Sequence, residues 1–334
     1  MYELEYPAPP GNEESHEGLP MMIALQGYAD AGQAVANSGM HVLEALDSDV
    51  LASFKLDELL DYRARRPRIT IEGSKIAKSE KLSLDLHAMK DLNGRPFLLL
   101  AGPEPDLRWE AFAHAVVELA RRANVSKVVT LYAAPMTVPH TRPLVISAHA
   151  SERALVTDYH TWDARMMIPG AAALETEMQL QTEGIDTIGL TAHVPHYISA
   201  SDYPEATHDL LRAFADLTDR ELPIRSLEKD MSRVREQLAE QVNESQEISA
   251  VVSALERQYD IEIERLKKRQ ENSLIAPGQE IPTGEELGAE FEQFLARMEE
   301  AGSEGSSSVD DDTHPGANQQ DGSTDDDDPT EDNN

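Results

Sequence analysis

The feature that most constrains this chain is the alternation of short, wholly apolar segments with longer amphipathic ones. Between residues 21 and 225, apolar runs such as Met21–Leu25 and Phe97–Ala101 are separated by stretches whose apolar residues recur every three or four positions. Strands that are apolar on both faces are typical of a largely parallel sheet with helices on either side. Residues 21–225 are therefore predicted to form one α/β core domain.

The period of the apolar residues predicts the elements of this core. The alternation from Lys81 to Met89 indicates a half-exposed strand, so one member of the sheet should be an antiparallel or edge strand. Further strands are expected at 50–54, 68–72, 127–132, 144–147 and 187–192, and helices near 35–46, 109–119, 171–182 and 204–219.

After Pro223 the pattern becomes wholly helical. One apolar stripe runs from Leu227 to Val242 and a second from Ile248 to Leu266, with polar residues between them, which favours two antiparallel helices. A capping box at 283–286 predicts a third helix. Residues 226–300 are thus expected to form a helical extension, a two-helix hairpin plus a final capped helix, that packs on the core or on a neighbouring subunit.

Both ends of the chain are strongly acidic. Residues 303–334 hold eleven acidic residues and no Lys or Arg. Such a segment cannot bury enough apolar surface to offset the entropy of ordering it. We therefore expect a disordered acidic tail at 301–334 and a flexible acidic N-terminus at 1–20. Partner binding should then depend on the folded body and not on the tail.

The overall composition argues against several classes of function. A formal net charge of −33 disfavours binding to nucleic acid or to an anionic membrane surface. The longest apolar runs are too short to cross a bilayer, and no basic segment precedes an apolar one at the N-terminus, as a secretory signal would require. The absence of cysteine removes disulfides, thiolate metal sites and a cysteine nucleophile. A soluble cytoplasmic protein is expected.

Two acidic loops follow apolar strands, at the position where open α/β sheets bind ligands. Gly27-Tyr28-Ala29-Asp30-Ala31-Gly32 joins a strand to a helix, so either Asp30 caps that helix or the helix N-terminus holds an anion. Neither a Walker pattern nor Gly-x-Gly-x-x-Gly is present, so a nucleotide site has little support and no cofactor is expected. Glu104 lies between two prolines, which suits a positioned carboxylate and a helix-starting turn equally well.

Two further loops contain histidine. Prolines stiffen the segment 139–143, which holds His140 and Arg142. These side chains could bind a carboxylate or phosphate, or Arg142 could make an interface contact. Because no partner base can be assigned, an interface or structural pairing is favoured over catalysis. The segment 193–197 holds two histidines, but Pro195 prevents a regular helical presentation and no acidic ligand is evident, so no metal site is expected. No Gly-x-Ser-x-Gly or His-Glu-x-x-His motif supplies a catalytic residue. The candidate pocket or interface residues are Gly27, Asp30, Gly32, Glu104, His140, Arg142, His196 and Tyr197.

Taken together, these loops resemble the proteasome assembly chaperone 2 family, in particular its actinobacterial branch. The similar stretches occur in the family's order, and the resemblance extends over about residues 20–298. They are GYADAG (27–32), YRARRPRITI (62–71), LLLAGPEPDLRWEAF (98–112), VPHTRP (138–143), HVPHYI (193–198), YPEATHDLLRAF (203–214), LERQYD (255–260) and PTGEELGAEFEQFL (282–295).

The resemblance implies a three-layer α/β/α fold similar to phosphorylase and hydrolase-like architectures, with a mostly parallel mixed sheet. It also implies self-association, with a trimer as one expected state, and a role in assembling or regulating proteasomes. Archaeal relatives can dock on proteasomes through a C-terminal hydrophobic–Tyr–any-residue end. This chain ends Glu331-Asp332-Asn333-Asn334, so docking through the folded body is expected instead.

Two classes of function follow. The leading hypothesis is a non-enzymatic, homo-oligomeric chaperone or adaptor that binds proteasome subunits or another protein, and sequence does not separate it from a purely structural oligomer. The alternative is a small-molecule-binding protein or hydrolase-like enzyme that uses the strand-end loops around Asp30, Glu104, His140, Arg142 and His196. Convergence of those side chains in one enclosed pocket would favour the alternative, and their separation would favour the first.

Overall fold

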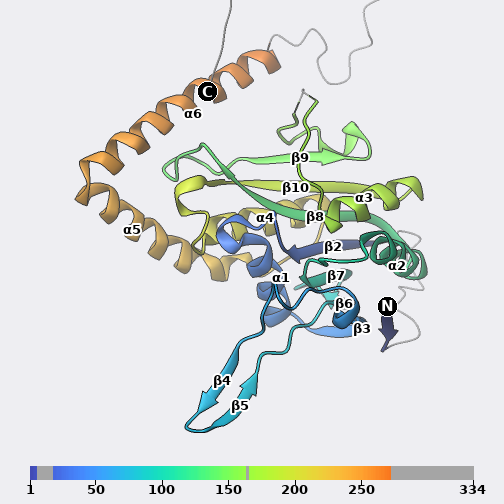
Figure 1. Ribbon diagram of the computed structural model, residues 1–334. Coiled ribbons are helices and arrows are strands. Elements are labelled where there is room, and N and C mark those ends of the chain that lie inside the picture. The colour runs from blue at the N-terminus through green and yellow to red at the C-terminus, as the bar shows by residue number, and fades with distance from the viewer. Residues whose placement is uncertain (6–17, 163–164, 272–334) are drawn as a thin grey trace, which may run out of the picture. The chain divides into compact units, whose positions relative to one another are not determined.

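The computed structural model describes residues 1–5, 18–162 and 165–271 (Figure 1). Met1–Lys267 form one compact unit. The capped helix predicted at 283–298 and the acidic tail predicted at 301–334 lie outside the described residues. Within the described ranges, no helix combines the length and the apolar character needed to cross a membrane.

A mixed eight-stranded sheet forms the centre of this unit, in the order β1-β3-β6-β7-β2-β8-β10-β9. Its strands are β1 Tyr2–Leu4, β2 Leu19–Gln26, β3 Ser48–Phe54, β6 Asp85–Lys90, β7 Pro96–Pro103, β8 Val125–Met136, β9 Ile146–Ala150 and β10 Asp186–Pro195. The four central strands β7, β2, β8 and β10 are parallel to one another. Their carboxyl ends therefore meet at one edge of the sheet.

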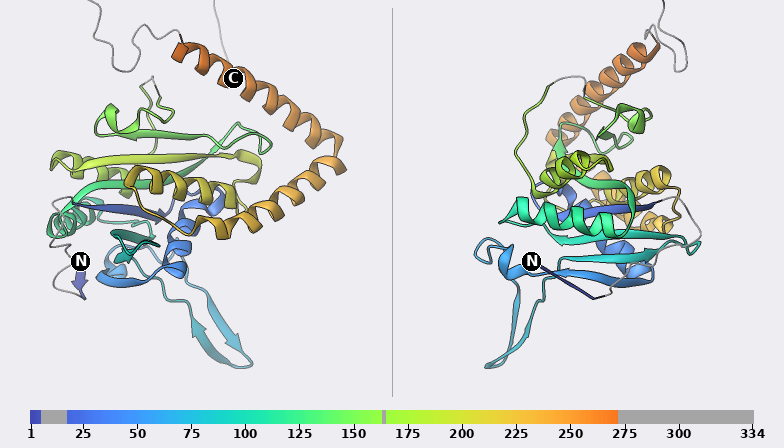
Figure 2. Two further views of the ribbon diagram at one scale, coloured as in Figure 1. Left: turned by 180° about the vertical axis from the view of Figure 1, so that it is seen from behind. Right: turned by 90° about the vertical axis from the view of Figure 1, so that its right-hand side faces the viewer.

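Helices cover both faces of this sheet (Figure 2). On one face lie α1 Ala34–Ala45 and α4 Pro204–Thr218, and on the other α2 Trp109–Arg122 and α3 Ala172–Thr182. Successive residues of β2 alternate between the two apolar cores, with Met21 and Ile23 in the core beneath α2 and Met22 in the core beneath α1. This alternation explains why β2 is apolar from Leu19 to Leu25, and it confirms the predicted α/β/α layers.

The sheet is mixed, as the family resemblance implies, and its parallel pairing is confined to the four central strands. The strands β1, β3 and β6 form an antiparallel flank against β7, and β9 pairs antiparallel with β10 at the opposite edge. The turn Asp91–Arg95 that joins β6 to β7 is too short for a crossover, so these two strands can only be antiparallel neighbours.

The N-terminal residues also differ from the expectation of a flexible segment over 1–20. Tyr2–Leu4 forms an edge strand paired with β3, and Leu19 already begins β2. The Tyr2 ring contacts Phe54 at a centroid distance of 5.9 Å, and its hydroxyl donates to Glu118 at 3.0 Å. Backbone pairing and one aromatic contact thus order a segment whose composition alone predicts none.

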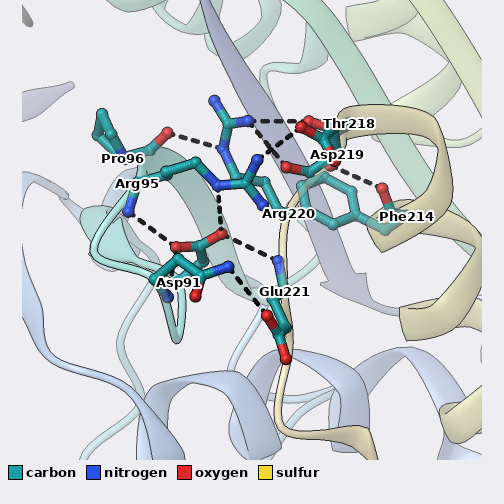
Figure 3. A network of polar contacts seen from close by, with 9 residues as sticks. Asp91, Arg95, Pro96, Phe214, Thr218, Asp219, Arg220 and Glu221 are labelled. Atoms are coloured by element: carbon teal, nitrogen blue, oxygen red, sulfur yellow. Dashed lines mark hydrogen bonds and ion pairs between the residues drawn. The ribbon is translucent and has the colours of Figure 1, made fainter.

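A buried carboxylate joins the β6–β7 turn to the end of α4 (Figure 3). Asp91 accepts hydrogen bonds from the backbone N–H groups of Asn93, Arg95 and Glu221 at 2.8–2.9 Å and from Arg95 Nε at 3.1 Å. Arg95 also pairs with Asp219 at 2.6 Å. Burial by itself raises the pKa of Asp91, but these donors more than offset it and the pKa is lowered. The network fixes the chain where α4 ends.

The helical extension begins with α5 Glu228–Glu244 and continues with α6 Gln246–Glu271. The sequence predicts an antiparallel pair, whereas the two helices diverge from Ser245 at an open angle in both views (Figures 1 and 2). A single connecting residue is shorter than the turns that fold one helix back along another. Leu238 of α5 packs into the core beneath α4, and α6 reaches the loop after β8 through polar contacts described below.

Candidate functional site

The predicted site residues lie on loops that follow the central parallel strands. Gly27 follows β2, Glu104 follows β7, His140 lies beyond β8, and His196 follows β10. Because these strands are parallel, all four loops stand at the same edge of the sheet (Figure 1). The hydrogen bonds described below, however, divide the predicted residues into separate groups.

Glu104 is a buried side chain whose carboxylate joins two loops. One oxygen accepts from the backbone N–H of Ala172, at the start of α3, at 2.7 Å, and the other accepts from Tyr28 N–H at 3.2 Å. Gly27 packs directly against this carboxylate, and a Cβ at that position would overlap it. Glu104 thus occupies the N-terminus of α3, where an anionic ligand would otherwise be stabilised.

Asp30 caps α1. One carboxylate oxygen accepts from Val35 N–H at 2.7 Å, and the carboxylate also lies 3.4 Å from Ala36 N. Burial raises the pKa of Asp30 to about 6, against the lowering effect of these N–H groups. Gly32 has φ +68°, and a side chain there would meet Tyr203. The structure therefore places Asp30 and Gly32 in the turn that starts α1, which is the capping alternative left open by the sequence.

His140 and Tyr197 come together across the loops that follow β8 and β10. The backbone N–H of His140 donates to the Tyr197 hydroxyl oxygen at 2.9 Å, and His140 Nδ1 lies 2.7 Å from the same oxygen. The two rings meet edge to face at 5.8 Å. Burial lowers the pKa of His140, against nearby carboxylates that raise it. The His196 ring also meets the Tyr197 ring edge to face, at a centroid distance of 5.4 Å.

Arg142 joins the same loop to α6. Its guanidinium donates to both carboxylate oxygens of Asp260 at 2.8 Å and to Glu256 at 3.0 Å. The hydrogen bond and charge of Asp260 raise the pKa of Arg142 despite partial desolvation. Tyr259 adds a hydrogen bond to the carbonyl of Pro143 at 2.9 Å. Arg142 thus makes an intramolecular clasp, using the bidentate geometry that suits a carboxylate.

A hollow of about 820 Å³ lies between this loop, α4 and α5. Among the predicted residues it is lined by His140 and Arg142 and not by the other six. Its further charged residues include Glu205, which holds Arg235 through two hydrogen bonds, and Asp209. The hollow therefore brings together basic and acidic side chains that already pair with one another.

Sequence reasoning missed a row of polar side chains on the α3 side of the sheet. Tyr132 of β8 donates to Glu177 of α3 at 2.7 Å, and His149 Nε2 of β9 lies 2.9 Å from the other oxygen of Glu177. Burial raises the pKa of Tyr132 well above its usual value, and the Glu177 charge adds to this. Burial by itself lowers the pKa of His149, but its contact with Glu177 outweighs this and raises it.

A second pair continues this row. Ser147 Oγ lies 2.9 Å from His193 Nε2, and the Trp162 ring stacks on His193 at 5.8 Å. Burial lowers the pKa of His193 to about 4, so the imidazole is neutral at neutral pH. One signal was available for this row: Glu177 falls on the apolar stripe of its helix, three residues before the buried Leu180. In the part of the chain that the structure describes, no three His, Asp or Glu side chains form a group that could hold a metal ion.

Comparison with the profiles of known protein families identifies the family of this chain. The profile of the PAC2 family matches residues 24–242, so the chain belongs to that family. This confirms the resemblance found in the strand-end loops.

Solved structures of actinobacterial proteins are similar to this chain. A Corynebacterium glutamicum protein of unknown function is 50% identical, with 79% of this chain and 98% of that chain covered and a TM-score of 0.77. A Mycobacterium tuberculosis protein of unknown function is 42% identical, with 80% and 92% covered and a TM-score of 0.78. A comparison with functionally curated proteins gives no match.

Relatives connected with the proteasome are more distant. A Mycobacterium tuberculosis proteasome-assembly chaperone homologue is 26% identical, with 70% of this chain and all of that chain covered, and its TM-score is 0.64. An archaeal proteasome activator from Pyrococcus furiosus is 13% identical with a TM-score of 0.54, which shows a shared fold alone.

Proposed function

We propose that this protein is a non-enzymatic, homo-oligomeric chaperone or adaptor that binds proteasome subunits through its folded body. The observation that carries the proposal is membership of the PAC2 family over residues 24–242. A 26% identical Mycobacterium tuberculosis relative is described as a proteasome-assembly chaperone homologue. The proposed site of action is the cytoplasm.

The pairing of the strand-end side chains supports a binding role over an enzymatic one. Glu104 and Asp30 are hydrogen-bonded to the first turns of α3 and α1, whereas His140 and Arg142 line a hollow on the side of α4 and α5. A small-molecule enzyme that uses all of these groups requires them to face one cavity, and the lining residues of the described hollow do not include Glu104 or Asp30.

Co-expression with proteasome α- and β-subunits tests this function. The full chain is expected to co-purify with α-subunits or with assembly intermediates and to increase the yield of complete particles on native gels. The matched control is the chain truncated after residue 302, which should behave like the full chain because docking is assigned to the folded body. If the full chain neither co-purifies with subunits nor changes the yield of particles, the proposal is wrong.

A further inference from the structure

The hollow beside the His140–Arg142 loop lies between three elements. The loop 140–144 forms one side of it. α4 lines it with residues three and four positions apart, from Glu205 to Arg212. α5 lines it in the same way from Met231 to Val242, so one face of each helix borders the hollow. Its volume of about 820 Å³ is in the range of pockets that hold small organic molecules.

The basic side chains of the hollow are its accessible ones. Among the described residues that line it, only Glu205 and Asp209 are acidic, and the side chain of each is 12% exposed. The side chains of Arg212 and Arg235 are 55% and 54% exposed. In a protein with a net charge of −33, the hollow therefore presents positive charge to the solvent.

Hydrogen bonding occupies the two carboxylates but not all of the guanidinium donors. Both oxygens of Glu205 accept from Arg235, at 2.8 and 3.1 Å. One oxygen of Asp209 lies 2.8 Å from His208 Nδ1 and 3.2 Å from Arg212 Nη2. A guanidinium has more N–H groups than these contacts use. The donors that remain on Arg212 and Arg235 can bind the oxygens of an added anion, while the carboxylates orient the two side chains.

An apolar side of the hollow restricts what that anion can be. Leu144, Met231 and Val242 line it beside the polar groups. Met231 is buried, and the other two side chains are partly buried. An apolar group that packs against them adds hydrophobic stabilisation that a bare inorganic anion lacks. The lining thus fits a molecule that has both an anionic group and an apolar body.

We propose that this hollow binds a small organic anion, in which a carboxylate or phosphate group is attached to an apolar body. The anionic group would contact Arg212 and Arg235, and the apolar body would pack on the α5 side. A nucleic acid or an anionic membrane would bring many charges against a protein of net charge −33, whereas a small anion can enter the hollow alone. The proposal goes beyond the protein-binding function proposed above and does not depend on it.

Calorimetric titration of the full chain tests the site. Phenyl phosphate and phenylacetate carry the two kinds of anionic group on an apolar ring, and at least one of them should bind. Inorganic phosphate should bind more weakly because it has no apolar body, and phenethylammonium should not bind because its charge is opposite. Binding of only one aromatic anion would identify the group that the site selects. The proposal is overturned if neither aromatic anion binds, or if phenethylammonium binds as tightly.

Two arginines of similar exposure provide matched variants. Arg212→Gln removes a guanidinium from the hollow and should weaken binding of the aromatic anion by about tenfold. Arg233→Gln is the control, because Arg233 is 60% exposed, pairs with Asp230 on α5 and lies outside the lining residues. Its affinity should equal that of the wild type. Equal affinities of the two variants would contradict the assignment to this hollow.

Hydrogen exchange locates the bound anion. Saturation with the aromatic anion should slow exchange of backbone amides in residues 140–144 and in the facing turns of α4 and α5, because binding stabilises the elements that it contacts. The amides of α2, on the opposite face of the sheet, should exchange as before. Slowing that is confined to other parts of the chain would place the anion elsewhere and overturn the proposal. None of these measurements uses a proteasome subunit, so the anion site and the proteasome-binding function fail separately.

Discussion

Removing the Asp91 carboxylate should destabilise the folded body more than any change at the exposed end of the same network. The Asp91 side chain is fully buried and accepts from three backbone N–H groups and one guanidinium nitrogen. Asp91→Ala leaves those donors buried without an acceptor. Breaking a buried ionic network costs about 3–5 kcal/mol, which for a unit of this size lowers Tm by roughly 6–20 °C.

The exposed member of the network supplies the matched control. Asp219 pairs with Arg95 but is 93% exposed in its side chain. Asp219→Asn keeps a residue that tolerates the positive φ of 51° at this position and removes only the exposed ion pair. Its unfolding midpoint should stay close to that of the wild type, because exposed ion pairs contribute little to stability.

Urea and thermal unfolding followed by far-UV circular dichroism measure both variants. The Asp91 contribution should be complete above pH of about 4, because its folded pKa is lowered, and it should be lost as pH falls through that folded pKa. The reasoning is refuted if Asp91→Ala loses no more stability than Asp219→Asn, since the buried acceptor would then be dispensable.

The remaining predictions concern the strand-end loops and the tail. Arg142→Ala should leave the core stable but increase hydrogen exchange of backbone amides in α6 around Asp260, and exchange equal to that of the wild type would show that the clasp does not hold α6. Asp30 has a folded pKa raised to about 6, so it binds more protons in the folded state than in the unfolded state. Stability should therefore fall by about 3 kcal/mol as pH rises from about 3 to about 7, and Asp30→Asn should abolish this slope in pH-dependent urea unfolding. Deletion of residues 303–334 should leave proteasome-subunit binding unchanged in a pull-down, and loss of binding would assign the contact to the tail.

The sequence predicts the core well because its signal is periodic. β2 and β7 are apolar at nearly every position, and burial on both faces is the physical cause of that pattern. β1 and β5, Lys75–Ser79, escape prediction for the opposite reason. Tyr2–Leu4 is ordered by pairing with β3, and Lys75–Ser79 is ordered by pairing with β4, Ile69–Glu72, so the stabilising partner lies outside the segment.

The sequence predicts where the candidate site residues lie, but not which residues their side chains contact. Parallel strands bring Gly27, Glu104, His140 and His196 to one sheet edge, as their places after strands predict. Which carboxylate meets which helix depends on the lengths and paths of the intervening loops. The contact between Glu104 and Ala172 spans 68 residues and leaves no local signal. The same holds for the row around Glu177, whose partners lie on two strands.

These pairings show why side chains of catalytic type do not by themselves define a catalytic site. A helix N-terminus is stabilised by an anion, whether that anion is a ligand or a carboxylate of the protein. Glu104 fills this position at α3 and Asp30 fills it at α1, so an anionic ligand at either place would have to displace a carboxylate that is already hydrogen-bonded. By contrast, the two-stranded ribbon formed by Ile69–Glu72 and Lys75–Ser79 exposes every residue of both strands. Polar pairing within the molecule therefore accounts for both carboxylates without a bound ligand or a chemical step.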